Sequence, residues 1–257
     1  MKGWDWLPWR RPAPPIDLAR WRDAVAACPL AQRLSDADRA HLRQLAARFL
    51  QRKRFFPIDF TLADPQRLLI AMQACVPVLQ HGFRALRDWQ SVIVYPGEFR
   101  VHRSHHDAAT GVVTEHDQTL AGEAWQRGPL VLSWANIEQD LLHPWDGYNV
   151  VAHEIAHKLD MLDGPPDGMP PLPRGMSRRR WIKTFQRAYD RLQRTLARGE
   201  ATLIDPYAAT NPGEYFAVVS EMHFSNPSRL EQAEPDIAGL LRAFYGPSPA
   251  PVVAESA

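Results

Sequence analysis

Hydrophobic residues in the first and last thirds of the chain recur every three or four positions, the spacing of one face of an α-helix. The middle third instead has short apolar runs separated by glycines, a pattern typical of β-strands. This order predicts an α+β fold that is mostly helical, with a small mixed β-sheet. The expected helices cover about residues 16–27, 35–49, 64–72, 150–162, 176–197, 213–224 and 236–244, and the expected strands cover 91–95 and 129–134, with weaker candidates at 99–102 and 120–125.

Polar residues and prolines mark several boundaries of these elements. Asn149 is a plausible N-cap for the helix that follows it, and the Gly164–Pro173 loop that ends this helix region is rich in proline. Asp64 followed by Pro65 has the N-cap-then-proline form of a helix start. The basic run 52–54 is interpreted as a solvated helix end.

Length and composition predict one domain at residues 16–245, helical to about residue 88, between an N-terminal extension (1–15) and a flexible tail (246–257). Lys and Arg number 30 against 29 Asp and Glu, and this balance argues against direct nucleic-acid binding. The sequence contains no run of about 18 apolar residues, so no membrane-spanning helix is expected. Cys28 and Cys75 form no Cys-x-x-Cys motif, which favours a reducing compartment such as the cytoplasm.

The stretch from His153 to His157 has the sequence His-Glu-x-x-His. Histidines four positions apart lie on one face of a helix, so both imidazoles can bind a single Zn²⁺. Glu154, beside the first histidine, can then reach a water on the metal, as in zinc metallopeptidases. The helical spacing of the surrounding apolar residues makes a metal-binding helix more probable than a buried helix with two core histidines.

A catalytic zinc usually takes three protein ligands, and the sequence offers several candidates for the third. Asp160 and Asp163 stand where a metzincin would have a glycine and a histidine, so that pattern fails; Asp160 shares the histidine face and could orient one of the rings. The gluzincin pattern fits better, because a later helix offers Glu214 and Glu221. These glutamates are seven positions apart, so both can share one helix face, and spacing alone leaves the choice open.

Three stretches of the chain resemble the Mlc titration factor A family of zinc peptidases: VAHEIAHKLDMLDG, IDPYAATNPGEYFAVVSEMHF, and EHDQTLAGEAW followed by GPLVLSW. The resemblance implies a zincin-like, gluzincin-type fold related to the catalytic domain of anthrax lethal factor, with the sheet beside the His-Glu-x-x-His helix. It implies that Glu214 is the third ligand and that Glu221 has a supporting role. Tyr207 matches the family's tyrosine, and His116 matches a histidine that closes the zinc's fourth position in a resting form.

The expected reaction is peptide hydrolysis at one zinc ion held by His153, His157 and Glu214. Glu154 is expected to act as general base and then to protonate the leaving amine, while the Tyr207 hydroxyl helps to stabilise the oxyanion. The resemblance implies aminopeptidase-like action on short peptides and binding of a sugar-responsive transcriptional repressor, Mlc. The alternative is a non-catalytic binding factor that sequesters such a regulator, with zinc in a latent or structural role.

Overall fold

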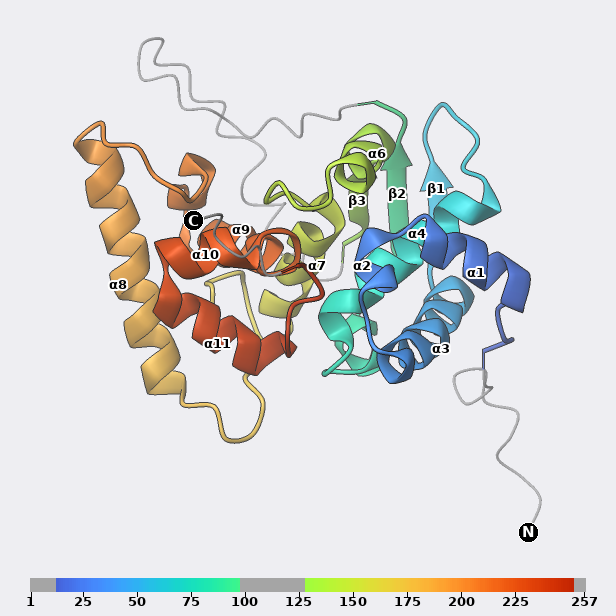
Figure 1. Ribbon diagram of the computed structural model, residues 1–257, viewed down its shortest axis with the longest axis horizontal. Coiled ribbons are helices and arrows are strands. Elements are labelled where there is room, and N and C mark those ends of the chain that lie inside the picture. The colour runs from blue at the N-terminus through green and yellow to red at the C-terminus, as the bar shows by residue number, and fades with distance from the viewer. Residues whose placement is uncertain (1–12, 98–127, 252–257) are drawn as a thin grey trace.

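A computed structural model of the chain describes residues 13–97 and 128–251 (Figure 1). It confirms a mostly helical α+β fold with a small sheet. His116 and the weaker strand candidates at 99–102 and 120–125 lie outside the described residues, as does most of the expected N-terminal extension.

The N-terminal part is helical, as expected, and the chain becomes helical again after the last strand. The first part contains α1 (Leu18–Ala26), α2 (Pro29–Gln32), α3 (Asp36–Arg52), α4 (Asp64–Cys75) and the 3-10 turns η2 (Val76–Val78) and η3 (Phe83–Leu86). The second part contains α6 (Trp134–Leu142), α7 (Val150–Asp160), α8 (Arg178–Ala197), η4 (Pro206–Ala209), α9 (Pro212–Ser225), α10 (Pro227–Ala233) and α11 (Pro235–Tyr245).

The described strands form one parallel sheet in the order β1–β2–β3. They are β1 (Arg54–Pro57), β2 (Ser91–Tyr95) and β3 (Leu130–Ser133). Phe55 pairs with Val92, and Val92 pairs with Leu130. The expected mixed pattern would need an antiparallel strand, and none occurs in the sheet as described.

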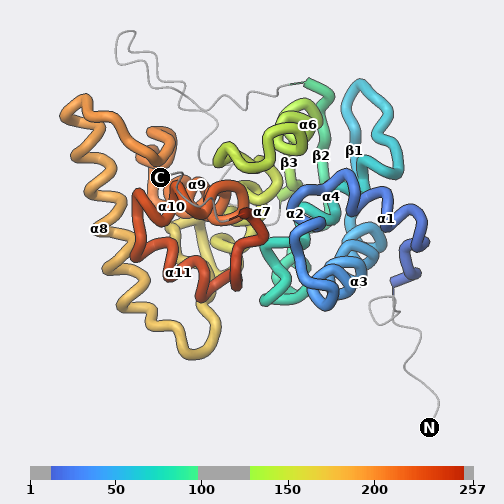
Figure 2. Tube along the Cα trace, viewed as in Figure 1, coloured from blue at the N-terminus to red at the C-terminus, as the bar shows by residue number. Residues whose placement is uncertain are grey.

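Helix α7 runs through the middle of the molecule, between α9 to α11 on one side and the sheet with α4 on the other (Figures 1 and 2). Along the outer side of the C-terminal half lies α8, whose Trp181 stacks on Phe185 with ring centroids 4.4 Å apart. The Trp181 indole N–H donates to the Gly168 carbonyl at 2.9 Å. This bond ties the Gly164–Pro173 loop, which contains no helix or strand, to the core.

Three local expectations need correction. Interpreting residues 52–54 as a solvated end is wrong for Lys53, which is 5% exposed and whose ammonium donates to the carbonyls of Leu86 and Trp89. Helix α4 begins at Asp64 rather than after it, and Ala63 precedes the helix, with its N–H bonded to Gln66 Oε1 at 2.6 Å. In the segment expected to be a loose tail, Pro249 and Ala250 are buried.

No helix among the described residues combines the length and apolar character needed to cross a membrane.

Candidate metal centre

The N-terminus of α7 is held by three polar side chains. Asn149 caps the helix, its Oδ1 accepting from the Ala152 N–H at 2.8 Å. The Val150 N–H donates to Asp140 Oδ2 at 2.7 Å, and the Asn149 N–H donates to Glu221 Oε1 at 2.6 Å. Amide groups that a helix start leaves without helical partners are thereby satisfied by the Asn149 amide oxygen and by the side-chain oxygens of Asp140 and Glu221. Acidic side chains also suit the positive end of the helix dipole. The helix that carries both histidines is therefore firmly placed.

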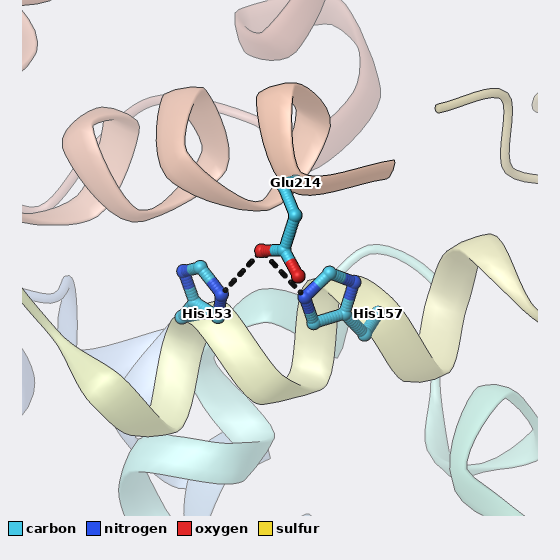
Figure 3. A group of neighbouring side chains, drawn as sticks. All are labelled: His153, His157 and Glu214. Atoms are coloured by element: carbon cyan, nitrogen blue, oxygen red, sulfur yellow. Dashed lines mark ion pairs between the residues drawn. The ribbon is translucent and has the colours of Figure 1, made fainter. Parts of the chain in front are cut away.

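Helix α9 brings a carboxylate to the histidines. Its N-cap is Asn211, whose Oδ1 accepts from the Glu214 N–H at 2.9 Å, and Pro212 occupies the first helical position. This start places Glu214 in the first turn of α9, facing α7 (Figure 3). A Cβ added at Gly213 would lie 3.1 Å from the Pro166 carbonyl oxygen, so glycine permits close contact with the Gly164–Pro173 loop.

Glu214 Oε2 lies between the two imidazoles, 3.3 Å from His153 Nε2 and 3.3 Å from His157 Nε2 (Figure 3). Among the described residues, these three are the group able to offer a metal ion three converging ligand atoms. The ligand atoms of a tetrahedral zinc site with bonds of about 2.0–2.2 Å lie about 3.3–3.6 Å apart. The spacing of the carboxylate from each imidazole therefore fits a zinc-sized cation bound between them.

The electrostatics of this cluster also favour a cation. Burial alone would lower the pKa of His153, but the carboxylates of Glu214 and Glu221 raise it to about 10. Burial alone would raise the pKa of Glu214, but the two histidines hold it far below its usual range. Glu214 Oε2 is buried and has no hydrogen-bond partner apart from these two imidazoles. An ionised, buried carboxylate of this kind is costly unless a proton-bearing imidazole or a metal ion neutralises it.

Glu221 supports His153 from the side opposite Glu214. Its Oε2 lies 3.1 Å from His153 Nδ1, and the residue is 7% exposed. An Nδ1–H that donates to Glu221 leaves the lone pair of Nε2 directed at the metal position, the usual arrangement of a carboxylate behind a metal-binding histidine. The structure thus separates the two glutamates that the sequence left open, with Glu214 at the two Nε2 atoms and Glu221 at Nδ1.

Glu154 and Tyr207 both lie close to the three-residue cluster. Glu154 is half-buried and follows His153 directly on α7, and its negative charge contributes to the raised pKa of that histidine. The ring of Tyr207, carried by η4, lies 6.4 Å from the His153 ring, centroid to centroid. His116, the remaining predicted site residue, lies outside the described residues.

The two aspartates after His157 do not belong to the group of metal-ligand atoms formed by His153, His157 and Glu214. Asp160 Oδ2 accepts from the Gly168 N–H at 2.8 Å, so this carboxylate holds the Gly164–Pro173 loop instead of orienting a histidine. Burial raises the pKa of Asp160 to about 7. Asp163 is exposed on the turn after α7.

Sequence reasoning missed Asp140 and the pair formed by Tyr148 and Asp205. The Tyr148 hydroxyl donates to Asp205 Oδ2 at 3.2 Å, and Asp205 Oδ1 accepts from the Tyr207 N–H at 2.8 Å. The hydroxyl bond joins positions 57 residues apart in the chain, so no local pattern signals it. The Asp205-Pro206-Tyr207 segment alone could have suggested a capped turn, because aspartate often accepts from the amide two positions later.

A cavity of about 320 Å³ lies behind α7, away from the metal cluster. It is lined by Leu159 and Leu162 of the α7 region, with Phe244, Arg84 and Pro170 among the other wall residues. At 100° per residue, Leu159 points away from the face of α7 that carries His153 and His157, and Leu162 follows the end of this helix. The cavity therefore forms no part of the metal centre.

Comparison with known proteins places the whole described core within one family. The model of the family described as glucose-regulated metallo-peptidase M90 matches residues 5–246. A protein of Synechocystis designated slr2042 is 40% identical over 248 residues, covering 93% of this chain and 89% of its own. The proteins named Mlc titration factor A from Pectobacterium atrosepticum and from Escherichia fergusonii are each 36% identical, covering 94% of this chain and 91% of their own.

Proposed function

This chain belongs to the glucose-regulated metallo-peptidase M90 family, and we propose that it is a zinc-dependent, aminopeptidase-like enzyme that hydrolyses short peptides. The observation that carries the proposal is the convergence of His153, His157 and Glu214 beside Glu154.

Zinc suits this donor set better than other common divalent ions. Two imidazoles and one carboxylate are the ligand set of many catalytic zinc sites, which keep one further position open, whereas calcium and magnesium prefer oxygen ligands. A bound zinc would supply a Lewis acid that lowers the pKa of water and polarises a carbonyl. We retain His116 as a proposed fourth ligand of a resting form, on the resemblance alone.

Glu154 and Tyr207 would perform the proton and hydrogen-bond chemistry. The Glu154 carboxylate would accept a proton from the attacking water and transfer it to the leaving amine, so that the carboxylate is regenerated after each turnover. The Tyr207 hydroxyl would donate a hydrogen bond to the oxygen of the scissile carbonyl as negative charge develops there. The position of the Tyr207 ring beside His153 supports this role.

The direct test is hydrolysis of alanine p-nitroanilide by purified protein of known zinc content, with and without a chelator. We expect chelator-sensitive release of nitroaniline and much slower release from the N-acetylated substrate. Glu154→Gln should keep its zinc and lose at least about 100-fold in kcat, since general-base catalysis contributes about 10²–10⁴-fold. Exposed Glu200 provides the matched control as Glu200→Gln. Full activity in Glu154→Gln would remove Glu154 from the mechanism.

Sequestration of a regulator is a second candidate function, favoured by the name Mlc titration factor A that several relatives carry. In this function, the protein would bind an Mlc-type repressor in the cytoplasm. Both cysteines of the chain are free, without a disulfide, which suits a reducing compartment. Titration calorimetry with a purified Mlc-type repressor tests it. Chelator-insensitive binding together with no peptide hydrolysis would favour sequestration over catalysis.

A further inference from the structure

We infer that Asp205 and Tyr148 are positioning residues that hold Tyr207 over the metal centre. This inference rests on the proposed role of Tyr207 in peptide hydrolysis. Its basis is a continuous chain of hydrogen bonds from the start of α7 to η4, formed by side chains that the family motif of two histidines and two glutamates does not include.

Asp205 fixes the start of η4. It is the N-cap of this 3-10 turn, and its Oδ1 accepts from the Tyr207 N–H at 2.8 Å. Pro206 occupies the first position of the turn and restricts the backbone there. The other end of η4 is held separately, by the Tyr189 hydroxyl, which donates to the Ala209 carbonyl at 2.9 Å. The Tyr207 carbonyl also accepts from the Thr210 hydroxyl at 2.7 Å, so the specific contribution of Asp205 is to hold the N–H side of Tyr207.

Tyr148 links Asp205 to the metal-binding helix. It directly precedes Asn149, the N-cap of α7, and its own N–H donates to Asp146 Oδ1 at 2.9 Å. Tyr148 is 49% exposed, so packing alone does not determine where its ring lies. Its hydroxyl donates to Asp205 Oδ2 at 3.2 Å, a long hydrogen bond that links the carboxylate to the start of α7.

The consequence is geometric coupling between the two halves of the site. The histidines are carried by α7, and Tyr207 is carried by η4, 50 residues further along the chain. The contacts of Asp205 span this separation, with one carboxylate oxygen on each side. A hydrogen-bond donor misplaced by about 1 Å can lower a rate about 100-fold. Loss of Asp205 should therefore affect turnover more than substrate affinity.

The test compares Asp205→Ala, Asp205→Asn and Tyr148→Phe in hydrolysis of alanine p-nitroanilide. We expect Asp205→Ala to lower kcat about 10- to 100-fold with KM and zinc content nearly unchanged. Asp205→Asn should retain activity within about threefold, because its amide oxygen can still accept from the Tyr207 N–H. Tyr148→Phe should cause a smaller loss of the same kind.

A matched control is Asp17→Ala. Asp17 Oδ1 accepts from the Ala19 N–H at 2.9 Å, so Asp17, like Asp205, binds the amide two positions after it. Asp17 lies at the start of α1, far from the metal centre in the chain. We expect Asp17→Ala to keep wild-type kcat. A positioning role also predicts that Asp205→Ala causes no further loss in a Tyr207→Phe background. Wild-type kcat in Asp205→Ala, or an equal loss in that background, would overturn the inference.

Failure of the proposed function would be visible separately, as absence of hydrolysis by the wild-type protein. In that case the crystal structure of Asp205→Ala decides the matter. Displacement of the Tyr207 ring from its 6.4 Å separation to the His153 ring would support positioning by Asp205. An unchanged ring position would overturn it.

Discussion

Replacing Glu221 by glutamine tests how the protein prepares His153 for a metal. Glu221 uses both oxygens, one on the Asn149 N–H at 2.6 Å and one at His153 Nδ1 at 3.1 Å. Glutamine has the same shape but a single acceptor oxygen. If that oxygen stays on Asn149, the amide NH₂ faces Nδ1 and favours the tautomer whose proton sits on Nε2, where the metal must bind. If the side chain flips, the buried Asn149 N–H loses its acceptor.

The first outcome removes a charge-assisted hydrogen bond from His153, worth about 1.5–3 kcal/mol, and weakens zinc binding. The second outcome instead lowers the free energy of unfolding. The contact to the Asn149 N–H is the shorter of the two, so we expect the first outcome. At about 1.4 kcal/mol per factor of ten, the expected loss of zinc affinity is about 10- to 100-fold. This agrees with the usual effect of removing a carboxylate behind a metal-binding histidine. Competition of the purified variant against a chromogenic zinc chelator at pH 7 measures the affinity.

Glu231→Gln is the matched control, because Glu231 is a glutamate on α10 whose partner, Arg242, is an exposed residue 3.4 Å away. The control should bind zinc like the wild-type protein. Zinc affinity of Glu221→Gln within about twofold of wild type, together with an unchanged free energy of unfolding, would refute the view that Glu221 sets the tautomer of His153.

Two further predictions concern stability. Burial lowers the pKa of Lys53 to about 7 from 10.5, so the unfolded chain binds more protons, and the free energy of unfolding should rise from pH 7 to pH 10. Denaturant titrations of Lys53→Met should show a slope of the free energy of unfolding against pH that is smaller than in the wild-type protein, by up to about 1.4 kcal/mol per pH unit. Identical slopes in the two proteins would contradict the burial argument. Gly168 has φ +81°, and an added Cβ would lie 2.7 Å from the Pro212 carbonyl oxygen. Gly168→Ala should therefore lower the free energy of unfolding by more than about 2 kcal/mol. Gly199, at φ +69° with open space around an added Cβ, is the control, and Gly199→Ala should lower it by about 1 kcal/mol. Equal losses in the two variants would disprove the contact with Pro212.

The long helices and the strands at 91–95 and 130–133 could be predicted because their apolar spacing is local. Helix α6 was missed, since the single residue Ser133 both ends β3 and caps the helix that begins at Trp134, so no separate loop marks the boundary. Strand β1 was hidden by the basic run before it, because only the tertiary structure shows that the Lys53 ammonium meets two buried carbonyls.

The candidate site divides in the same way. The pairing of His153 with His157 follows from helix geometry and needs no tertiary information. The choice between Glu214 and Glu221 needs tertiary information. Residues seven positions apart on one helix share a face, and they differ only in which residues of the neighbouring helix they contact. Asp140 accepts from the Val150 amide ten positions away, and Asp205 accepts from the Tyr148 hydroxyl 57 positions away. A sequence pattern gives no sign of which distant donor a carboxylate will meet.

Anomalous X-ray diffraction from zinc-loaded crystals, recorded at the zinc absorption edge, tests the central claim most directly. The account predicts one strong peak about 2.0–2.2 Å from His153 Nε2, His157 Nε2 and a carboxylate oxygen of Glu214. A peak that lacks Glu214 among its ligands, or no peak between α7 and α9, would contradict it.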